Sequence, residues 1–536
     1  MYKGIMFNQL KKIDFYHQNK QKFLVVFYFL IILISFYIIN IQNLKNFSYT
    51  FLIYLLFLLI KNKCGRIRNS VFLVFNFILG IELFFSIKYG YISESLLKSA
   101  LENDSEQSVT MILQELFPII IPAVLFSIIF TFTIYNKIQL NLNNKFLYWG
   151  TIFICCFFFF KNTFYYYLSD KRHVRDFQID PFFSLNKSIR MKYPMVIGNT
   201  SILLTSYFGF KEKYTNVIEH ERYNQSIINN KSMLYGKYKN IILILGESAY
   251  RGRHSIYGYE KNTTPNMSKI FSQKNSCVIE QAHSPASITR DSIPMLLSFA
   301  KPNNELPLLE EKNIIEMANI QKYHTSWISK TRESGAHSSK YSIIAKLSNT
   351  FIENLEDDLQ LPEKLIETNF QKNENNFIVL HLAGSHKPYN LGYDQLDSQD
   401  LPNGDKYDLT IHHTDRVIEK IYKTLKVNLD NFILIYTPDH GEIVDLGHGL
   451  LRKSKNFSNQ FEVPLMIYST YDDFPCKEIE NYRNNDKMIN TSNIVYLFSK
   501  LLGYSVDIDQ SLIINDLILS VDGQPYEYQS FIKKYQ

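Results

Sequence analysis

Long apolar stretches dominate the first third of the chain, and short polar segments separate them. They occupy residues 23–40, 47–60, 71–87, 117–135 and about 146–168. A helix that crosses a bilayer needs about 20 apolar residues. The pattern therefore predicts a transmembrane domain of five helices over residues 1–168. The second stretch is short, and the fifth requires the Lys161 side chain to extend toward the membrane surface. Buried helices of a soluble core are the alternative, which five such stretches in succession disfavour.

Basic residues between these stretches indicate how the helices are oriented. They are concentrated before the first stretch, after the second and after the fourth, at Lys3, Lys11, Lys12, Lys20, Lys22, Lys61, Lys63, Arg66, Arg68, Lys137 and Lys145. Cytoplasmic loops carry such an excess of Lys and Arg. We therefore predict a cytoplasmic N-terminus, and five crossings place everything after residue 168 on the far side of the membrane.

The pattern changes in the rest of the chain. Residues 169–235 are mixed and polar and are expected to be a linker, whereas residues 236–536 carry short β-branched apolar runs. The strongest runs are 240–245, 377–382 and 432–436, with weaker ones at 324–329 and 464–468. Segments with helical periodicity, such as 307–321 and 409–426, lie between them. Buried strands alternating with helices predict an α/β domain with a mostly parallel sheet.

Composition limits the number of structural units and the classes of partner to expect, but it does not indicate a function. A length of 536 residues favours more than one structural unit, and the net charge of +6 comes from scattered basic residues. This distribution gives no reason to expect nucleic acid as a partner. The five cysteines form no CxxC or Cys/His spacing. Cys277 and Cys476 could form a disulfide, but the sequence does not decide whether they do.

Polar residues follow each of the three strong strands. Glu247 and Ser248 follow the first, His386 follows the second, and "PDHGE" after the third supplies Asp439, His440 and Glu442, with His448 a little further on. Ligands bind beyond the carboxyl ends of parallel strands, so we expect these side chains to share one edge of the sheet. Carboxylates with imidazoles suit a cation such as Zn²⁺. The sequence therefore predicts a metal site, with Glu247 among its ligands.

Two hydroxyls are candidates for a nucleophile. Ser248 lies in "GESAY", which approaches the G-x-S-x-G nucleophile elbow but has Tyr250 where the second glycine belongs. Thr289 lies in "QAHSPASITRDSIPMLLSFA", where small residues lead into a helix-like segment. A hydroxyl at a helix N-terminus can meet a phosphate held by backbone amides. We favour Thr289, although a simple N-cap would also explain a threonine there.

Together these segments resemble the phosphoethanolamine transferases that modify lipopolysaccharide, a branch of the alkaline phosphatase/sulfatase superfamily. The similar blocks are "GESAYRGRHSIYGYEKNTTPNM" (246–267), the T-x4-P-x3-S pattern of Thr289, Pro294 and Ser298, "GSHKPY" (384–389) and "PDHGE" (438–442). Their order, after five apolar stretches and a linker, extends the resemblance over nearly the whole chain.

The resemblance implies roles for individual residues. Glu247, Thr289, Asp439 and His440 match the zinc ligands of that family, and Thr289 matches its nucleophile. His386 and His448 match histidines that hold the phosphate or a second zinc. Glu106 is a loose match to a glutamate that is implicated in lipid contact.

The implied activity is transfer of phosphoethanolamine from phosphatidylethanolamine to lipopolysaccharide through a covalent intermediate on Thr289. Residues around "SIYGY" are more similar to the branch that acts on core sugars than to the lipid A branch. The implied location is a bacterial inner membrane, with the catalytic domain in the periplasm, and we expect a monomer.

Three other functions fit parts of the pattern. A glycerol-phosphate transferase of the lipoteichoic acid synthase type shares five spans and a threonine nucleophile, but differs at the "YGY…TTP" stretch. A membrane-anchored sulfatase or phosphodiesterase-like hydrolase is the second, and a sulfatase needs a C/S-x-P-x-R motif that is absent around Thr289. A structural zinc domain is the third, but it leaves a hydroxyl among the ligands unexplained.

Overall fold

The computed structural model describes residues 2–39, 44–59, 65–90, 117–138, 149–154, 156–157, 160–161, 198–201, 204, 228–229, 237–331, 341–472, 476–506, 508 and 510–536. The chain divides into two compact units, one of residues 1–92 and 108–213 and one of residues 93–107 and 214–536. Each unit has its own hydrophobic core, so each is described by itself.

The first unit is helical. Its elements are α1 (Tyr2–Ile38), α2 (Leu44–Leu59), α3 (Gly65–Tyr89), α6 (Phe117–Ile129), the π-helical turn η2 (Phe130–Ile134) and the 3-10 turn η3 (Tyr135–Lys137). Aromatic rings fill its core, where Tyr28, Tyr54 and Phe72 are almost fully buried. Close packing of such rings holds the helices together, and the buried Glu82 of α3 accepts a 2.9 Å hydrogen bond from Asn199.

Two segments of this unit, Arg66–Tyr89 and Phe117–Lys137, are long and apolar enough to cross a membrane, with mean hydropathies of 2.1 and 2.4. The prediction of five spans is confirmed only to this extent. Helix α2 has 16 residues, fewer than the roughly 20 that a span requires. Helix α1 begins at Tyr2, well before the first apolar stretch. Much of the fifth predicted stretch and most of the predicted linker lie outside the described residues.

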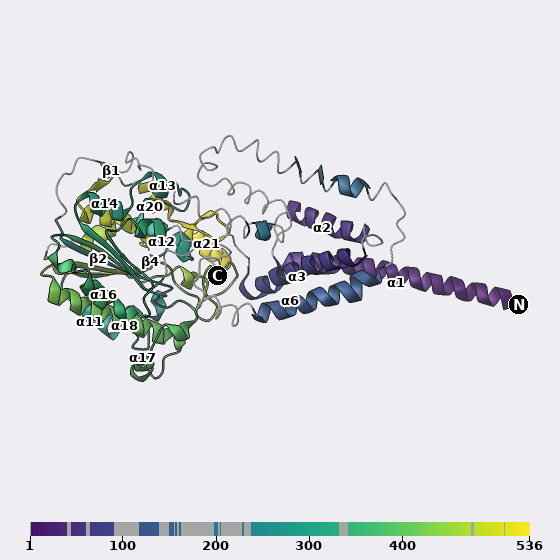
Figure 1. Cartoon of the computed structure of the whole chain (residues 1–536), viewed down its shortest axis with the longest axis horizontal. Helices are drawn as coiled ribbons and strands as arrows, with labels where there is room; N and C mark the ends of the chain where they lie inside the picture. The colour runs from purple at the N-terminus through teal and green to yellow at the C-terminus, as the bar shows by residue number, and fades with distance from the viewer. Residues whose placement is uncertain are drawn as a thin grey trace. The chain divides into compact units, whose positions relative to one another are not determined.

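A seven-stranded sheet forms the centre of the second unit (Figure 1). In spatial order its strands are β3 (Ser276–Val278), β9 (Met466–Ser469), β8 (Ile433–Pro438), β2 (Asn240–Gly246), β7 (Asn376–His381), β5 (His324–Ser329) and β6 (Thr350–Ile352). The five strands from β8 to β6 are parallel, and β9 pairs antiparallel with β8. The predicted mostly parallel sheet is therefore confirmed.

Helices cover both faces of this sheet (Figure 1). One face packs against α11 (Pro265–Phe271), α16 (Leu361–Glu367) and α18 (Lys406–Asn428), and the other against α12 (Thr289–Leu297), α14 (Ile314–Ile320) and α19 (Ile494–Leu501). Alternate residues of β2 enter the two cores: Ile242 and Ile244 on one side, Leu243 and Leu245 on the other. A strand buried on both faces explains why its sequence is continuously apolar.

The remaining elements are short. They are β1 (Ile228–Asn229), β4 (Ala282–His283), β10 (Ile489–Asn490), β11 (Ser505–Val506), β12 (Leu517–Leu519), β13 (Pro525–Glu527), α13 (Pro307–Glu310), α15 (Ser342–Ala345), α17 (Gln395–Asp400), α20 (Gln510–Asn515) and α21 (Tyr528–Tyr535). The helix predicted over 307–321 is interrupted, because Asn313 forms a capping box that starts α14 anew.

Cys277 and Cys476, whose pairing the sequence left open, form a disulfide. It ties edge strand β3 to a 3-10 segment (Cys476–Tyr482) across 199 residues of sequence. Disulfides persist in oxidising compartments.

Replacing both cysteines by serine should lower the free energy of unfolding by about 2–4 kcal/mol, because the unfolded chain loses a long covalent loop. Denaturant unfolding of the full chain in detergent measures this. Free thiols at both positions in protein purified without reductant would contradict the pairing.

Candidate functional site

The site is built at the carboxyl edge of the sheet, where two neighbouring strands end side by side. Gly246, the last residue of β2, lies opposite Pro438, the last residue of β8. The next residues, Glu247 and Asp439, therefore leave the sheet at the same level, and both side chains are buried. Parallel pairing thus brings together two carboxylates that are 192 positions apart in sequence.

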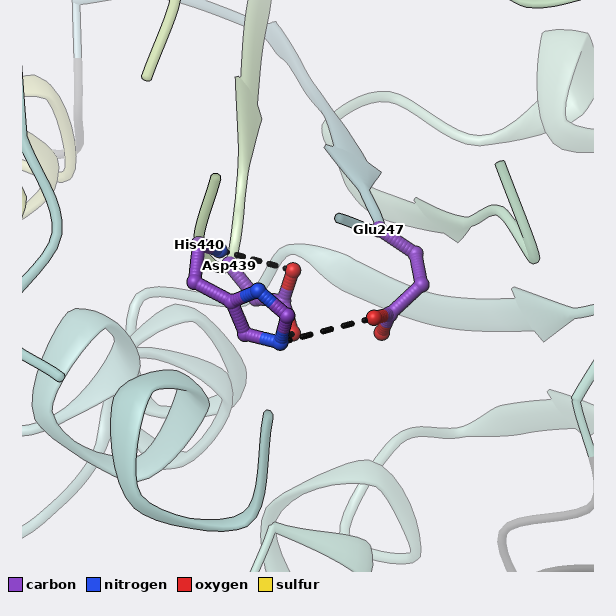
Figure 2. A group of neighbouring side chains, drawn as sticks. All are labelled: Glu247, Asp439 and His440. Atoms are coloured by element: carbon purple, nitrogen blue, oxygen red, sulfur yellow. Dashed lines mark hydrogen bonds and ion pairs between the residues drawn. The ribbon is translucent and has the colours of Figure 1, made fainter. Parts of the chain in front are cut away.

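His440 completes the group with one ring nitrogen facing the carboxylates (Figure 2). Its Nε2 lies 3.5 Å from a carboxylate oxygen of Glu247 and 3.2 Å from Oδ2 of Asp439. Its other nitrogen, Nδ1, lies 2.9 Å from the carbonyl oxygen of Gly441. A carbonyl oxygen only accepts, so Nδ1 carries the proton and Nε2 presents its lone pair.

Thr289 is the first residue of α12 and points its hydroxyl into the same group. Its Oγ1 lies 3.2 Å from Glu247 Oε2 and 3.2 Å from Nε2 of His440. The four residues that the sequence selected as metal ligands are therefore brought together. Ser248 is also adjacent, but its hydroxyl donates to Glu247 over 2.6 Å and its backbone adopts φ +55°.

The charges of this group are unbalanced without a cation. Burial lowers the pKa of His440 to about 4, so the ring is neutral at pH 7. Burial and the nearby charge of Asp439 raise the pKa of Glu247. Oδ2 of Asp439 is buried and accepts no hydrogen bond from the described residues. Facing lone pairs and carboxylates repel each other, and a metal ion between them removes this conflict. The donor set therefore fits a metal such as Zn²⁺.

Two more histidines lie beside this candidate metal site. The ring of His448 is centred 4.2 Å from that of His440, and the ring of His386 is 5.8 Å from that of His448. Burial lowers the pKa of both to about 4. His386 Nδ1 donates to the Lys387 carbonyl over 2.6 Å, so the Nε2 of the neutral ring carries a lone pair.

Glu442 orients His448, a role that the sequence did not indicate. One oxygen of this fully buried carboxyl lies 2.8 Å from Nδ1 of His448, and the other accepts a 2.6 Å hydrogen bond from Tyr389. Glu442 belongs to the motif "PDHGE" and Tyr389 to "GSHKPY", but the spacing of the two motifs does not indicate that these side chains meet. Such a carboxylate fixes the tautomer and direction of an imidazole.

The loop that carries His386 is hydrogen-bonded to the backbone of Glu247. Ser385 donates its backbone N–H to the Glu247 carbonyl over 3.0 Å. Gly384 has φ +50°, and a Cβ there would lie 2.9 Å from that carbonyl oxygen, so glycine is required. Asp358, which no motif marks, accepts from the N–H groups of Ala383 and Gly384 at 3.0 and 2.9 Å.

A second acidic cluster is unsuited to a metal. Asp394, Asp397 and His413 lie close enough together to hold a cation. However, Nη1 of Arg416 lies 2.7 Å from Asp394 and 2.9 Å from Asp397. Burial raises the pKa of Asp397, but hydrogen bonds from His412, His413 and Arg416 outweigh burial and lower it. The guanidinium already supplies the positive charge. Glu106, the predicted lipid contact, lies outside the described residues.

Comparisons with known proteins agree with the motifs. Residues 239–504 match the family model named Sulfatase. The chain is 30% identical over 294 residues to phosphoethanolamine transferase EptA of Helicobacter pylori, covering 50% of this chain and 53% of the relative. It is 21% identical to phosphoethanolamine transferase EptC of Escherichia coli K12, covering 57% and 58%. The matches thus span little more than half of these relatives.

A solved structure extends the similarity of fold. The integral membrane protein lipooligosaccharide phosphoethanolamine transferase A of Neisseria meningitidis superimposes with a TM-score of 0.55 at 16% identity, covering 86% of this chain and 87% of that one. The fold is therefore shared over both units. The resemblance to the phosphoethanolamine transferases is confirmed.

Asp439→Asn and Glu247→Gln should each lower zinc affinity by more than about 100-fold. Loss of a residue that only orients a metal ligand already lowers affinity by about 10- to 100-fold, and these two residues are proposed to bind the metal directly. Asp445→Asn is the matched control, because it removes the same charge from an exposed residue whose φ of +70° suits asparagine. Equilibrium dialysis with zinc measures all three. Unchanged zinc binding by Asp439→Asn would rule out the site.

Proposed function

Starting from a Sulfatase-family domain that resembles those of the phosphoethanolamine transferases, we propose that this protein transfers phosphoethanolamine from phosphatidylethanolamine to lipopolysaccharide. The observation that carries the proposal is the Thr289 hydroxyl at 3.2 Å from both Glu247 and His440. A structural metal site has no need for a hydroxyl at this place, whereas a transferase needs a nucleophile there.

Glu247, Asp439, His440 and Thr289 would hold the zinc. When bound, zinc supplies Lewis acidity that lowers the pKa of a hydroxyl and balances charge on phosphoryl oxygens. Thr289 is positioned for attack because α12 begins at this residue and its hydroxyl is directed at Glu247 Oε2, which can accept the hydroxyl proton.

In the first step, Thr289 Oγ1 forms a bond to the donor's phosphorus, and the bond from phosphorus to the diacylglycerol oxygen breaks. His386 and His448 lie beside the group, where an incoming phosphate would raise the pKa of their imidazoles. The protonated rings would then donate hydrogen bonds to phosphoryl oxygens and a proton to the departing alkoxide.

In the second step, an oxygen of the acceptor forms a bond to phosphorus, and the bond to Thr289 breaks. The proton of the acceptor hydroxyl passes to the histidine that gave up its proton in the first step, and Thr289 takes back the proton held by Glu247. Both donor and acceptor are amphiphilic, so an active domain joined to membrane helices suits them. We propose the core sugars as the region modified, on the resemblance around "SIYGY".

The proposed location is the inner membrane, with a cytoplasmic N-terminus, five spans over residues 1–168 and the domain of residues 236–536 in the periplasm. The distribution of basic residues supports this orientation. The disulfide between Cys277 and Cys476 supports an oxidising compartment for the second unit.

Incubation with phosphatidylethanolamine should leave a phosphoethanolamine adduct on the peptide that contains Thr289, and Thr289→Ala should abolish it. Ser248→Ala is the matched control, because it removes the other hydroxyl that contacts Glu247 and should keep the adduct. Peptide mass spectrometry distinguishes the cases. An adduct on Ser248 would refute the assigned nucleophile, and a glycerol-phosphate adduct would refute the assigned donor.

A further inference from the structure

Two basic segments lie together beyond the site, and neither takes part in the chemistry described above. The first follows His448 and carries Lys453 and Lys455, and the second is the last turn of α21, with Lys533 and Lys534. All four lysines are exposed. We refer to these four lysines as the basic surface.

The two segments are fixed against each other. The backbone N–H of Ser454 donates to the Tyr535 carbonyl over 2.8 Å. The ring of Tyr535 stacks on that of Phe457 with centroids 5.0 Å apart. Beneath them, Leu451 packs against a core that includes Phe531 and Ile532. The basic surface is therefore a rigid feature of the fold.

Its charge is not neutralised locally. Residues 450–456 and 528–536 contain no Asp or Glu. None of Lys453, Lys455, Lys533 and Lys534 forms an ion pair with a described carboxylate. Lysines at a helix C-terminus interact favourably with the helix dipole, which accounts for Lys533 and Lys534. No comparable reason explains Lys453 and Lys455.

The first basic segment is connected to the surroundings of Thr289 through Gly449. Gly449 lies between His448 and the first basic segment, and a Cβ there would be 2.9 Å from Ile288 Cγ1. Ile288 is the N-cap of α12 and directly precedes Thr289. His448 itself keeps 19% of its side chain exposed. Lys453 and Lys455 therefore follow a partly exposed histidine of the site by only five and seven residues.

We propose that the basic surface binds the phosphate-bearing part of the acceptor while its reacting oxygen approaches Thr289. This inference rests on the proposed function and specifies how the acceptor is recognised. The donor, phosphatidylethanolamine, is zwitterionic with no net charge, so a surface with only positive charge adds little to its binding. A lipopolysaccharide with several phosphates is polyanionic, and cations near an anionic lipid surface strengthen binding cumulatively.

The test compares two variants of the full chain in detergent with equal loss of charge. The first changes Lys453, Lys455, Lys533 and Lys534 to Gln. The control changes four other exposed lysines, Lys239, Lys269, Lys372 and Lys420, to Gln. The dissociation constant for fluorescently labelled lipopolysaccharide is measured at low and high salt, so the result does not depend on turnover.

The basic-surface variant should bind lipopolysaccharide at least about tenfold more weakly than the control variant at low salt. The difference should shrink at high salt, where exposed charges are screened. It should also disappear with lipopolysaccharide stripped of its phosphates.

Three results would overturn the inference: equal affinity of the two variants, a difference that persists with dephosphorylated lipopolysaccharide, or equally strong competition by phosphatidylglycerol micelles. The last would identify a general anionic-lipid surface. Failure of the proposed function would be recognised by a different result: the unaltered protein would form no phosphoethanolamine adduct on Thr289.

Discussion

The structure depends on a conflict of charge at one edge of its sheet. Two buried carboxylates, a neutral imidazole and a hydroxyl converge there, and Oδ2 of Asp439 accepts no hydrogen bond from the described residues. Buried charges of one sign are costly unless paired or bound to metal. A bound cation would remove this conflict and, under the proposed function, would lie next to the proposed nucleophile, Thr289. The same arrangement would then serve both the stability of this edge and the proposed reaction.

The surrounding scaffold holds this group in place through backbone contacts. Pairing of β2 with β8 sets the level of Glu247 and Asp439. Gly441 of "PDHGE" has the backbone of a neighbouring segment so close that a Cβ would lie 2.8 Å from the Glu462 carbonyl oxygen. Preorganised groups of this kind need no rearrangement when charge develops during phosphoryl transfer.

Much of this arrangement could be predicted from the sequence. Continuously apolar runs identified strands β2, β7 and β8, because a strand buried on both faces leaves no polar positions. Residues directly after those strands had to meet at one edge. What escaped prediction depends on contacts between distant loops: Asp358 beneath the loop of His386, and the link from Tyr389 through Glu442 to His448. Periodicity carries no information about such pairs.

Anomalous scattering at the zinc edge, from crystals of the full chain grown with zinc, would locate a bound zinc ion. We expect a peak at bonding distance, about 2 Å, from the side chains of Glu247, Asp439, His440 and Thr289. A peak among Asp394, Asp397 and His413, with none at the carboxyl edge of β2 and β8, would show that zinc binds elsewhere.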